Sequence, residues 1–163
     1  MQAEMYEITP CPQGRLAICP RPRGGLWLME EMVSLKRRGV TNVVSLLTAP
    51  EVKELQLQAE EKFCNDLLVK FHYHPIPDRG LPVQPAFDQF ITSLSLCMLQ
   101  DGFIAIHCKA GIGRSTVVAA ALLCRFGLSA DQAIDLISQA RGFDVPDTEE
   151  QYDFIQKLGG PRS

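Results

Sequence analysis

The residue types that could carry chemistry are concentrated in one segment, His-Cys-Lys-Ala-Gly-Ile-Gly-Arg-Ser at residues 107–115. Gly111 and Gly113 allow backbone conformations that residues with a Cβ avoid, so several N–H groups can converge on one point and bind an anion. A helix starting directly behind this loop would add positive potential from its N-terminal dipole. The candidate phosphate-binding positions are Lys109, Ala110, Gly111, Ile112, Gly113 and Arg114.

Cys108 and Arg114 are the two side chains of this loop that could react with a phosphate group or hold it. The ordinary pKa of a thiol, about 8.5, falls when positive potential surrounds the sulfur, so Cys108 would be a thiolate nucleophile at neutral pH. Arg114 offers a planar fork that matches two phosphate oxygens and can follow the charge that spreads over them in the transition state. The alternative is a structural strand-to-helix turn, which needs neither side chain at its centre.

The segments on either side of the loop predict a strand before it and a helix after it. Residues 103–106 form a fully apolar run, as expected for a buried parallel strand. Residues 116–126 are apolar nearly all round, which is typical of a helix buried at the centre of a domain. Ligands of open α/β sheets bind at the carboxyl ends of the strands, where this loop would lie.

The rest of the chain predicts strands and helices in alternation. Further strands are expected at residues 6–8, 15–18, 42–47 and 69–73. Helices are expected over residues 26–39, 48–67 with a break, and 85–102, and capping-box patterns open helices at residues 48–51, 129–132 and 148–151. This alternation predicts a single α/β domain over residues 1–163, with a central, mostly parallel sheet flanked by helices and the phosphate-binding loop at a strand C-terminus.

Composition and charge argue against several classes of protein. Hydrophobic residues make up 46% of the 163 residues and charged residues 21%, which fits one folded globular domain. The net charge of −3 gives no general attraction to nucleic acid, so nucleic-acid binding is not expected. Neither a signal-peptide pattern nor an apolar run of spanning length is found, so we expect a cytoplasmic protein without a membrane anchor. The 6 cysteines have no metal-site spacing, so no metal is expected.

The loop resembles the signature of the cysteine-dependent protein tyrosine phosphatase superfamily. The pattern H-C-x-x-G-x-x-R-[S/T] is matched at His107, Cys108, Gly111, Arg114 and Ser115. A weaker resemblance extends over most of residues 15–158 and is closest to the small, atypical dual-specificity phosphatases. The resemblance implies a protein tyrosine phosphatase-like fold and chemistry without a cofactor, because thiolate, arginine and backbone amides stabilise the transferring phosphoryl group.

The resemblance also implies roles for other residues. Asp78, 30 residues before Cys108, is similar to the general acid that protonates the leaving oxygen and later takes a proton from water; its alternative role is an ordinary turn residue. Ser115 resembles the hydroxyl that supports the departing thiolate, and it can also cap the helix. His107 resembles the buried residue that orients the loop. Apart from the resemblance, Lys109 and Arg79 are expected at the mouth of the pocket, where they would attract phosphorylated substrates; the alternative is that both are simply solvated.

Two departures from the family pattern leave questions open. Classical members position the hydrolytic water with a glutamine in a Q-T-x-x-Q-Y pattern, whereas this chain has Asp147 at the first place and Gln151 at the second. Gln151 also fits as the capping-box partner of Thr148, so the residue that positions water stays undecided. Lipid phosphatases often carry two loop lysines, whereas Lys109 is followed by Ile112 at the second place, which disfavours a phosphoinositide substrate.

These features predict a phosphatase that hydrolyses phosphotyrosine on proteins, with phosphoserine and phosphothreonine as further candidates, through a phosphocysteine intermediate. The expected partner is a phosphorylated protein or peptide, and the expected state is a monomer. One alternative is a non-catalytic module that binds phosphorylated partners, which would need neither the nucleophile Cys108 nor the acid Asp78. A second is a sulfurtransferase, which also uses a loop cysteine but has no need of a separate acid loop.

Overall fold

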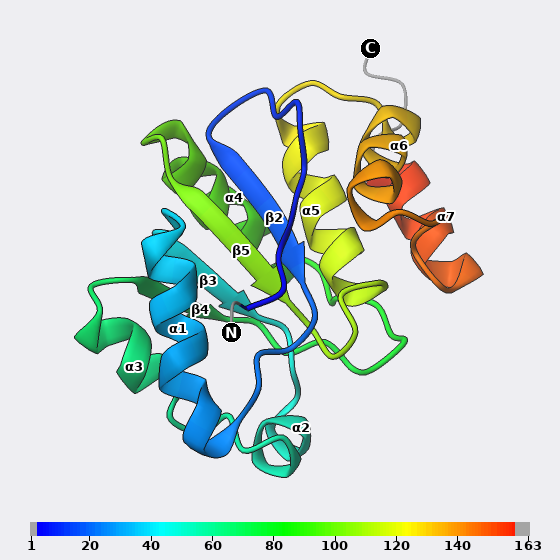
Figure 1. Ribbon diagram of the computed structural model, residues 1–163. Helices are drawn as coiled ribbons and strands as arrows, with labels where there is room; N and C mark the ends of the chain where they lie inside the picture. The colour runs from blue at the N-terminus through cyan, green and yellow to red at the C-terminus, as the bar shows by residue number, and fades with distance from the viewer. Residues whose placement is uncertain (1–2, 159–163) are drawn as a thin grey trace.

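A five-stranded sheet with the order β1-β2-β5-β3-β4 crosses the computed structural model, which describes residues 3–158 (Figure 1). β2, β5, β3 and β4 are parallel, and the short β1 pairs with β2 in the antiparallel direction. The strands are β1 (Tyr6–Glu7), β2 (Arg15–Cys19), β3 (Asn42–Ser45), β4 (Lys70–Tyr73) and β5 (Phe103–His107). The predicted α/β class with a mostly parallel sheet is confirmed.

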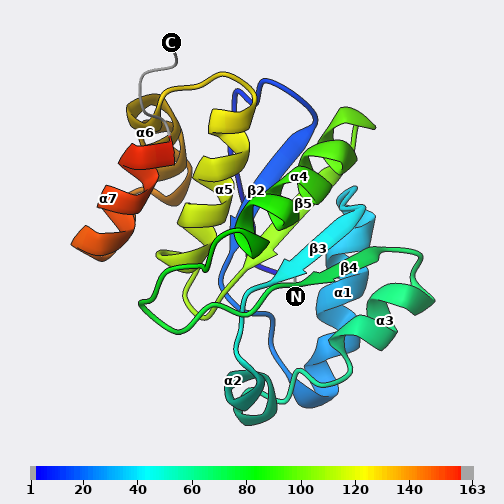
Figure 2. The ribbon, with the colours of Figure 1, turned by 180° about the vertical axis from the view of Figure 1, so that it is seen from behind.

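Helices cover both faces of this sheet (Figures 1 and 2). α1 and α3 lie on one face, and α4 and α5 lie on the other with α6 and α7 packed outside α5. The helical segments are η1 (Gly25–Trp27), α1 (Leu28–Arg37), α2 (Ala49–Glu54), α3 (Glu60–Asp66), α4 (Ala86–Leu99), α5 (Arg114–Arg125), α6 (Ala130–Arg141) and α7 (Glu149–Leu158). Within the described range, none of these helices has the length and apolar character needed to span a bilayer.

Successive side chains of each strand point to opposite faces of the sheet, so the hydrophobic core is divided into two clusters, one on each face. In β5, Ile104 and Ile106 point toward the face covered by α4 and α5, whereas Phe103 and Ala105 point toward α1 and α3. α5 is buried at every residue from 114 to 124, as its apolar composition predicts. β5 is therefore the central strand, and the loop between β5 and α5 is fixed at both ends by buried elements.

The third strand is shorter than predicted. β3 ends at Ser45 rather than at residue 47, but Leu46 still donates from its N–H to the carbonyl of His107, at 3.1 Å. The Leu46 carbonyl in turn accepts from the N–H of Ile76 at 3.0 Å. The chain after β4 is thereby held beside the end of β3, which brings residues 77–80 next to the loop that follows β5. The break expected within residues 48–67 separates α2 from α3.

Candidate active site

Cys108 lies at the centre of the loop, at the N-terminus of α5. Its sulfur accepts a hydrogen bond from the N–H of Gly111 at 3.3 Å and lies 3.4 Å from Ser115 Oγ. Gly111 has φ of +71°, and a Cβ there would lie 2.7 Å from the backbone carbonyl of Cys19, so only glycine fits this tight loop against β2. The loop therefore directs a backbone N–H toward the sulfur, as an anion-binding loop does.

A cavity of about 190 Å³ opens above the sulfur. Its lining comes from the loop after β5, the segment before α4 and the start of α7, and consists of Asp78, Arg79, Cys108, Lys109, Ala110, Ile112, Gly113, Arg114, Asp147 and Gln151. The predicted nucleophile, acid, arginine and glutamine are thus brought together in one cavity. Ser115 and His107 lie behind the loop, and both are buried.

The guanidinium of Arg114 is 2% exposed and is held by three partners. Nη1 donates to Glu51 Oε1 at 2.7 Å and to the Ile76 carbonyl at 2.9 Å, while Nη2 donates to Glu51 Oε2 at 2.9 Å. Nη2 also donates to Asp78 Oδ1 at 3.2 Å. The bidentate pair with Glu51 fixes the plane of the guanidinium, so it can meet an incoming anion without first losing side-chain freedom.

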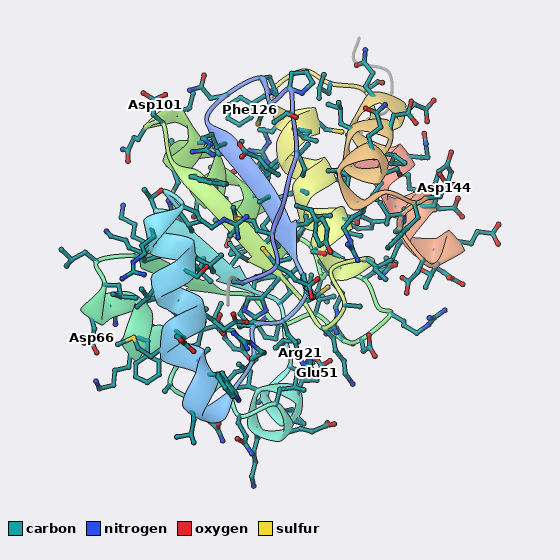
Figure 3. All side chains as sticks on the ribbon, viewed as in Figure 1. Arg21, Glu51, Asp66, Asp101, Phe126 and Asp144 are labelled. Atoms are coloured by element: carbon teal, nitrogen blue, oxygen red, sulfur yellow. The ribbon has the colours of Figure 1, made fainter. Side chains whose placement is uncertain are left out.

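Glu51 is a site residue that the sequence did not reveal. It belongs to α2, which lies beyond the carboxyl ends of the strands, as its label in Figure 3 shows. Glu51 closes the predicted capping box, since its Oε1 accepts from the N–H of Thr48 at 2.9 Å, and the same carboxylate binds Arg114. The hydrogen bonds from Arg114 lower the pKa of the Glu51 carboxyl to about 2, against the opposing effect of burial. Glu51 is therefore a constant negative charge at neutral pH.

Asp78 and Arg79 lie on a turn that closes one side of the cavity. The N–H of Gly80 donates to the Pro77 carbonyl at 2.7 Å, so the turn proposed as an alternative for Asp78 is present, and the carboxylate also faces Arg114. Arg79 Nη1 lies 3.5 Å from Asp147 Oδ2, across the cavity mouth. This ion pair leaves less of the Arg79 charge available to a substrate than the sequence suggested.

The capping box predicted for Thr148 and Gln151 is only half formed. The Gln151 N–H donates to Thr148 Oγ1 at 3.1 Å, but the side chain turns toward the cavity, where Nε2 donates to the Gly80 carbonyl at 3.3 Å. Gln151 Oε1 is buried and has no hydrogen-bond partner within residues 3–158. A Cβ at Gly113 would lie 2.8 Å from this oxygen. The tertiary contacts with Gly80 and Gly113 thus override the local capping pattern.

Glu60 and Arg141 support the loop from behind, and neither was identified from the sequence. Glu60 Oε2 lies 2.6 Å from Nε2 of His107, and both side chains are buried. Arg141, at the end of α6, donates from Nε to the Gly111 carbonyl at 2.9 Å and from Nη2 to the Ala110 carbonyl at 3.5 Å. These bonds hold loop carbonyls away from the cavity, so the loop N–H groups can face it. Lys109 remains exposed at the rim.

Comparisons with known proteins agree with this arrangement. The family model described as "Dual specificity phosphatase, catalytic domain" matches residues 32–158. Cyclin-dependent kinase inhibitor 3 from Rattus norvegicus is 29% identical over 133 residues, covering 80% of this chain and 63% of the relative. The probable protein tyrosine phosphatase type IVA A of Dictyostelium discoideum is 30% identical over 86 residues, covering 52% of each chain. This chain thus spans less than two thirds of the length of these relatives.

Solved structures show the same fold. A crystal structure of kinase associated phosphatase, with serine in place of its catalytic cysteine, has a TM-score of 0.87 at 24% identity and covers 97% of this chain and 94% of its own. A putative protein tyrosine phosphatase from Leishmania major has a TM-score of 0.75 at 22% identity and covers 96% of this chain and 98% of its own. The predicted phosphatase-like fold is therefore confirmed.

Proposed function

Because the chain belongs to the dual specificity phosphatase family, we propose that it hydrolyses phosphate monoesters on proteins through a phosphocysteine at Cys108. Phosphotyrosine is the first candidate substrate, and phosphoserine and phosphothreonine are further ones. The observation that carries the proposal is that the Cys108 sulfur and the Arg114 guanidinium face one cavity with an acid, Asp78, at its edge. We assign the activity to one catalytic domain of residues 1–163, acting as a cytoplasmic monomer on a phosphorylated protein or peptide.

In the first step, the Cys108 thiolate attacks phosphorus, an S–P bond forms and the P–O bond to the leaving group breaks. Asp78, in its acid form, gives its proton to the leaving oxygen. The hydrogen bond from Arg114 Nη2 to Asp78 occupies the donor that a phosphate oxygen would take, so substrate binding exchanges one acceptor for the other. That exchange frees the Asp78 carboxyl to reach the leaving oxygen. The hydrogen bonds that Arg114 donates to Glu51 keep the guanidinium in place throughout.

In the second step, water attacks the phosphocysteine, an O–P bond forms and the S–P bond breaks to release inorganic phosphate. Asp78 takes the proton from water, and the departing thiolate is stabilised by the Gly111 N–H and the nearby Ser115 hydroxyl. We assign the positioning of water to Gln151, since its buried Oε1 has no partner within the described range and the residue lines the cavity. An attacking water can donate a hydrogen bond to that oxygen.

The direct test is turnover of an aryl phosphate and of a phosphotyrosyl peptide by reduced wild-type protein in the presence of a chelator. Acid quenching during turnover should trap a phosphorylated peptide containing Cys108. A phosphoinositide assayed in parallel should be hydrolysed more slowly than the peptide. Folded protein that binds the phosphopeptide without hydrolysing it would contradict the proposal and support a binding module instead.

Replacing Asp78 by asparagine is expected to lower kcat about 10²-fold, because the leaving oxygen must then depart unprotonated. The loss should be smaller for an aryl phosphate with a strongly acidic phenol, which needs less protonation, than for phenyl phosphate. Steady-state kinetics on both esters measure this difference. Asp153→Asn, an exposed carboxylate on α7, is the matched control. An equal loss for the two esters would contradict the role of Asp78 as acid.

Replacing Gln151 by methionine, which keeps the side-chain volume, is expected to slow hydrolysis of the phosphocysteine by about 10²-fold through misplacement of water. Attack by Cys108 does not use Gln151, so the first turnover should stay fast. Rapid-mixing kinetics should then show a burst of phenol followed by a slow steady state. Gln89→Met, on an exposed position of α4, should show no such change. A variant that merely melts at lower temperature, without a burst, would remove Gln151 from the mechanism.

A further inference from the structure

Two polar side chains, both almost fully buried, pair behind the loop. His107 is the last residue of β5 and Glu60 is the first residue of α3, and their side chains are 4% and 3% exposed. The distance between His107 Nε2 and Glu60 Oε2 is 2.6 Å. A carboxylate so deeply buried is strongly disfavoured unless a hydrogen-bonded cation or donor compensates it. The compensating group here is the imidazole ring.

Each nitrogen of the His107 ring faces a neighbouring oxygen. Nε2 faces the Glu60 carboxylate, and Nδ1 lies 3.4 Å from the carbonyl oxygen of Cys108. With Glu60 ionised, both neighbours are hydrogen-bond acceptors, and both then receive a hydrogen bond only when each ring nitrogen carries a proton. That form is the imidazolium. Its positive charge would lie one residue from the sulfur of Cys108.

We propose that Glu60 is a positioning residue that keeps His107 as an imidazolium and thereby favours the thiolate of Cys108. The inference deepens the proposed phosphatase function and rests on it for its biological meaning. The imidazolium acts in two ways. Its charge stabilises the nearby thiolate, and its Nδ1–H holds the Cys108 carbonyl behind the loop, away from the anion-binding face.

Other charged and titratable groups face the same region. On the side of β2 and α1, one small cavity is lined by His107 together with Cys19, Arg21, Glu4 and Glu31. On the other side, a groove is lined by Glu60 together with Lys53, Glu61 and Tyr73, and Cys64 lies one turn along α3. Arg114 faces the sulfur itself. A substitution of Glu60 alone leaves all these groups in place, so a change in the ionisation of Cys108 can be attributed to the loss of the contact between Glu60 and His107.

The test measures the ionisation of the Cys108 thiol through its rate of alkylation by iodoacetamide as a function of pH. Peptide mass spectrometry separates Cys108 from the other five of the 6 cysteines. In Glu60→Gln, which has the same shape without the charge, the midpoint should rise by about one pH unit, a tenfold loss of thiolate below the midpoint. Glu61→Gln, an exposed neighbour on α3, is the matched control and should not move it.

A second measurement addresses the ring directly and needs no variant of Glu60. The imidazole ¹⁵N signals of the wild type should show His107 doubly protonated at neutral pH, with assignment against His72 and His74 from a His107→Asn variant. In the His107→Asn background, Glu60→Gln should cause no further shift of the alkylation midpoint. A neutral His107 in the wild type would overturn the inference, and so would an unchanged midpoint in folded Glu60→Gln.

Alkylation does not require turnover, which separates this inference from the proposed function. Protein that hydrolyses no phosphoester but shows the shifted midpoint would contradict the phosphatase and support the role of Glu60. If the wild type hydrolyses phosphoesters but Glu60→Gln leaves the alkylation midpoint unchanged, the phosphatase proposal is supported and the role of Glu60 is contradicted.

Discussion

Cys108→Ser is expected to lower kcat on the order of 10⁴-fold or more while leaving phosphate binding intact, since it removes the group on which the whole reaction depends. A serine hydroxyl in this loop stays protonated at neutral pH and is a poor nucleophile. Arg114, Glu51 and the loop N–H groups are untouched, so the variant should bind a phosphotyrosyl peptide about as tightly as the wild type. Steady-state kinetics and calorimetric titration measure the two quantities.

The matched control is Cys97→Ser, since Cys97 is a partly buried cysteine of α4 and lies outside the cavity lining. It should keep wild-type turnover. Cys108→Ser protein with turnover within tenfold of the wild type would rule out a phosphocysteine and the proposed mechanism with it.

Arg114→Lys is expected to lower kcat/KM about 10²- to 10³-fold, comparable to the loss of a preorganised transition-state donor. Lysine keeps the positive charge but cannot bind Glu51 with two nitrogens and still present a planar fork to phosphate. The loss should appear in kcat as well as KM, because the arginine follows charge onto the oxygens as the transition state forms. Kinetics over a range of phosphotyrosyl peptide concentrations separate the two parameters.

Arg125→Lys provides the control for that substitution at the opposite end of the same helix, where the side chain is exposed and donates to Thr92 Oγ1. It should behave as the wild type. An Arg114→Lys variant with a raised KM and an unchanged kcat would mean that Arg114 only binds the ground state.

The central part of the site could be predicted from the sequence because it is local. Cys108, the glycines and Arg114 lie in one short segment, and the apolar runs around it predict the buried strand and the buried helix that hold the loop. Asp78 was predicted as the acid from its resemblance to an acid loop, and its turn was recognised from the sequence. Its hydrogen bond with Arg114 could not be predicted, because it depends on the backbone hydrogen bond between Ile76 and Leu46, which are distant in the sequence.

The supporting residues could not be predicted because their roles depend on distant elements. Glu51 has a complete local explanation as the end of a capping box, and nothing in its neighbourhood indicates that α2 faces Arg114. Glu60 opens α3 without any motif, so its burial against His107 depends on the packing of α3 on the sheet. For Gln151 the local pattern was misleading. The capping-box spacing predicted a hydrogen bond between its side chain and Thr148, but the side chain donates to the Gly80 carbonyl instead.

The bonds from Arg141 to the loop carbonyls have a consequence for how the protein responds to heating. The loop is tied to α6 by Arg141, to α2 by the bonds from Arg114 to Glu51, and to α3 by the contact between His107 and Glu60. Because elements from several parts of the fold hold the loop, we expect it to lose its arrangement together with them, so that thermal inactivation coincides with the unfolding transition.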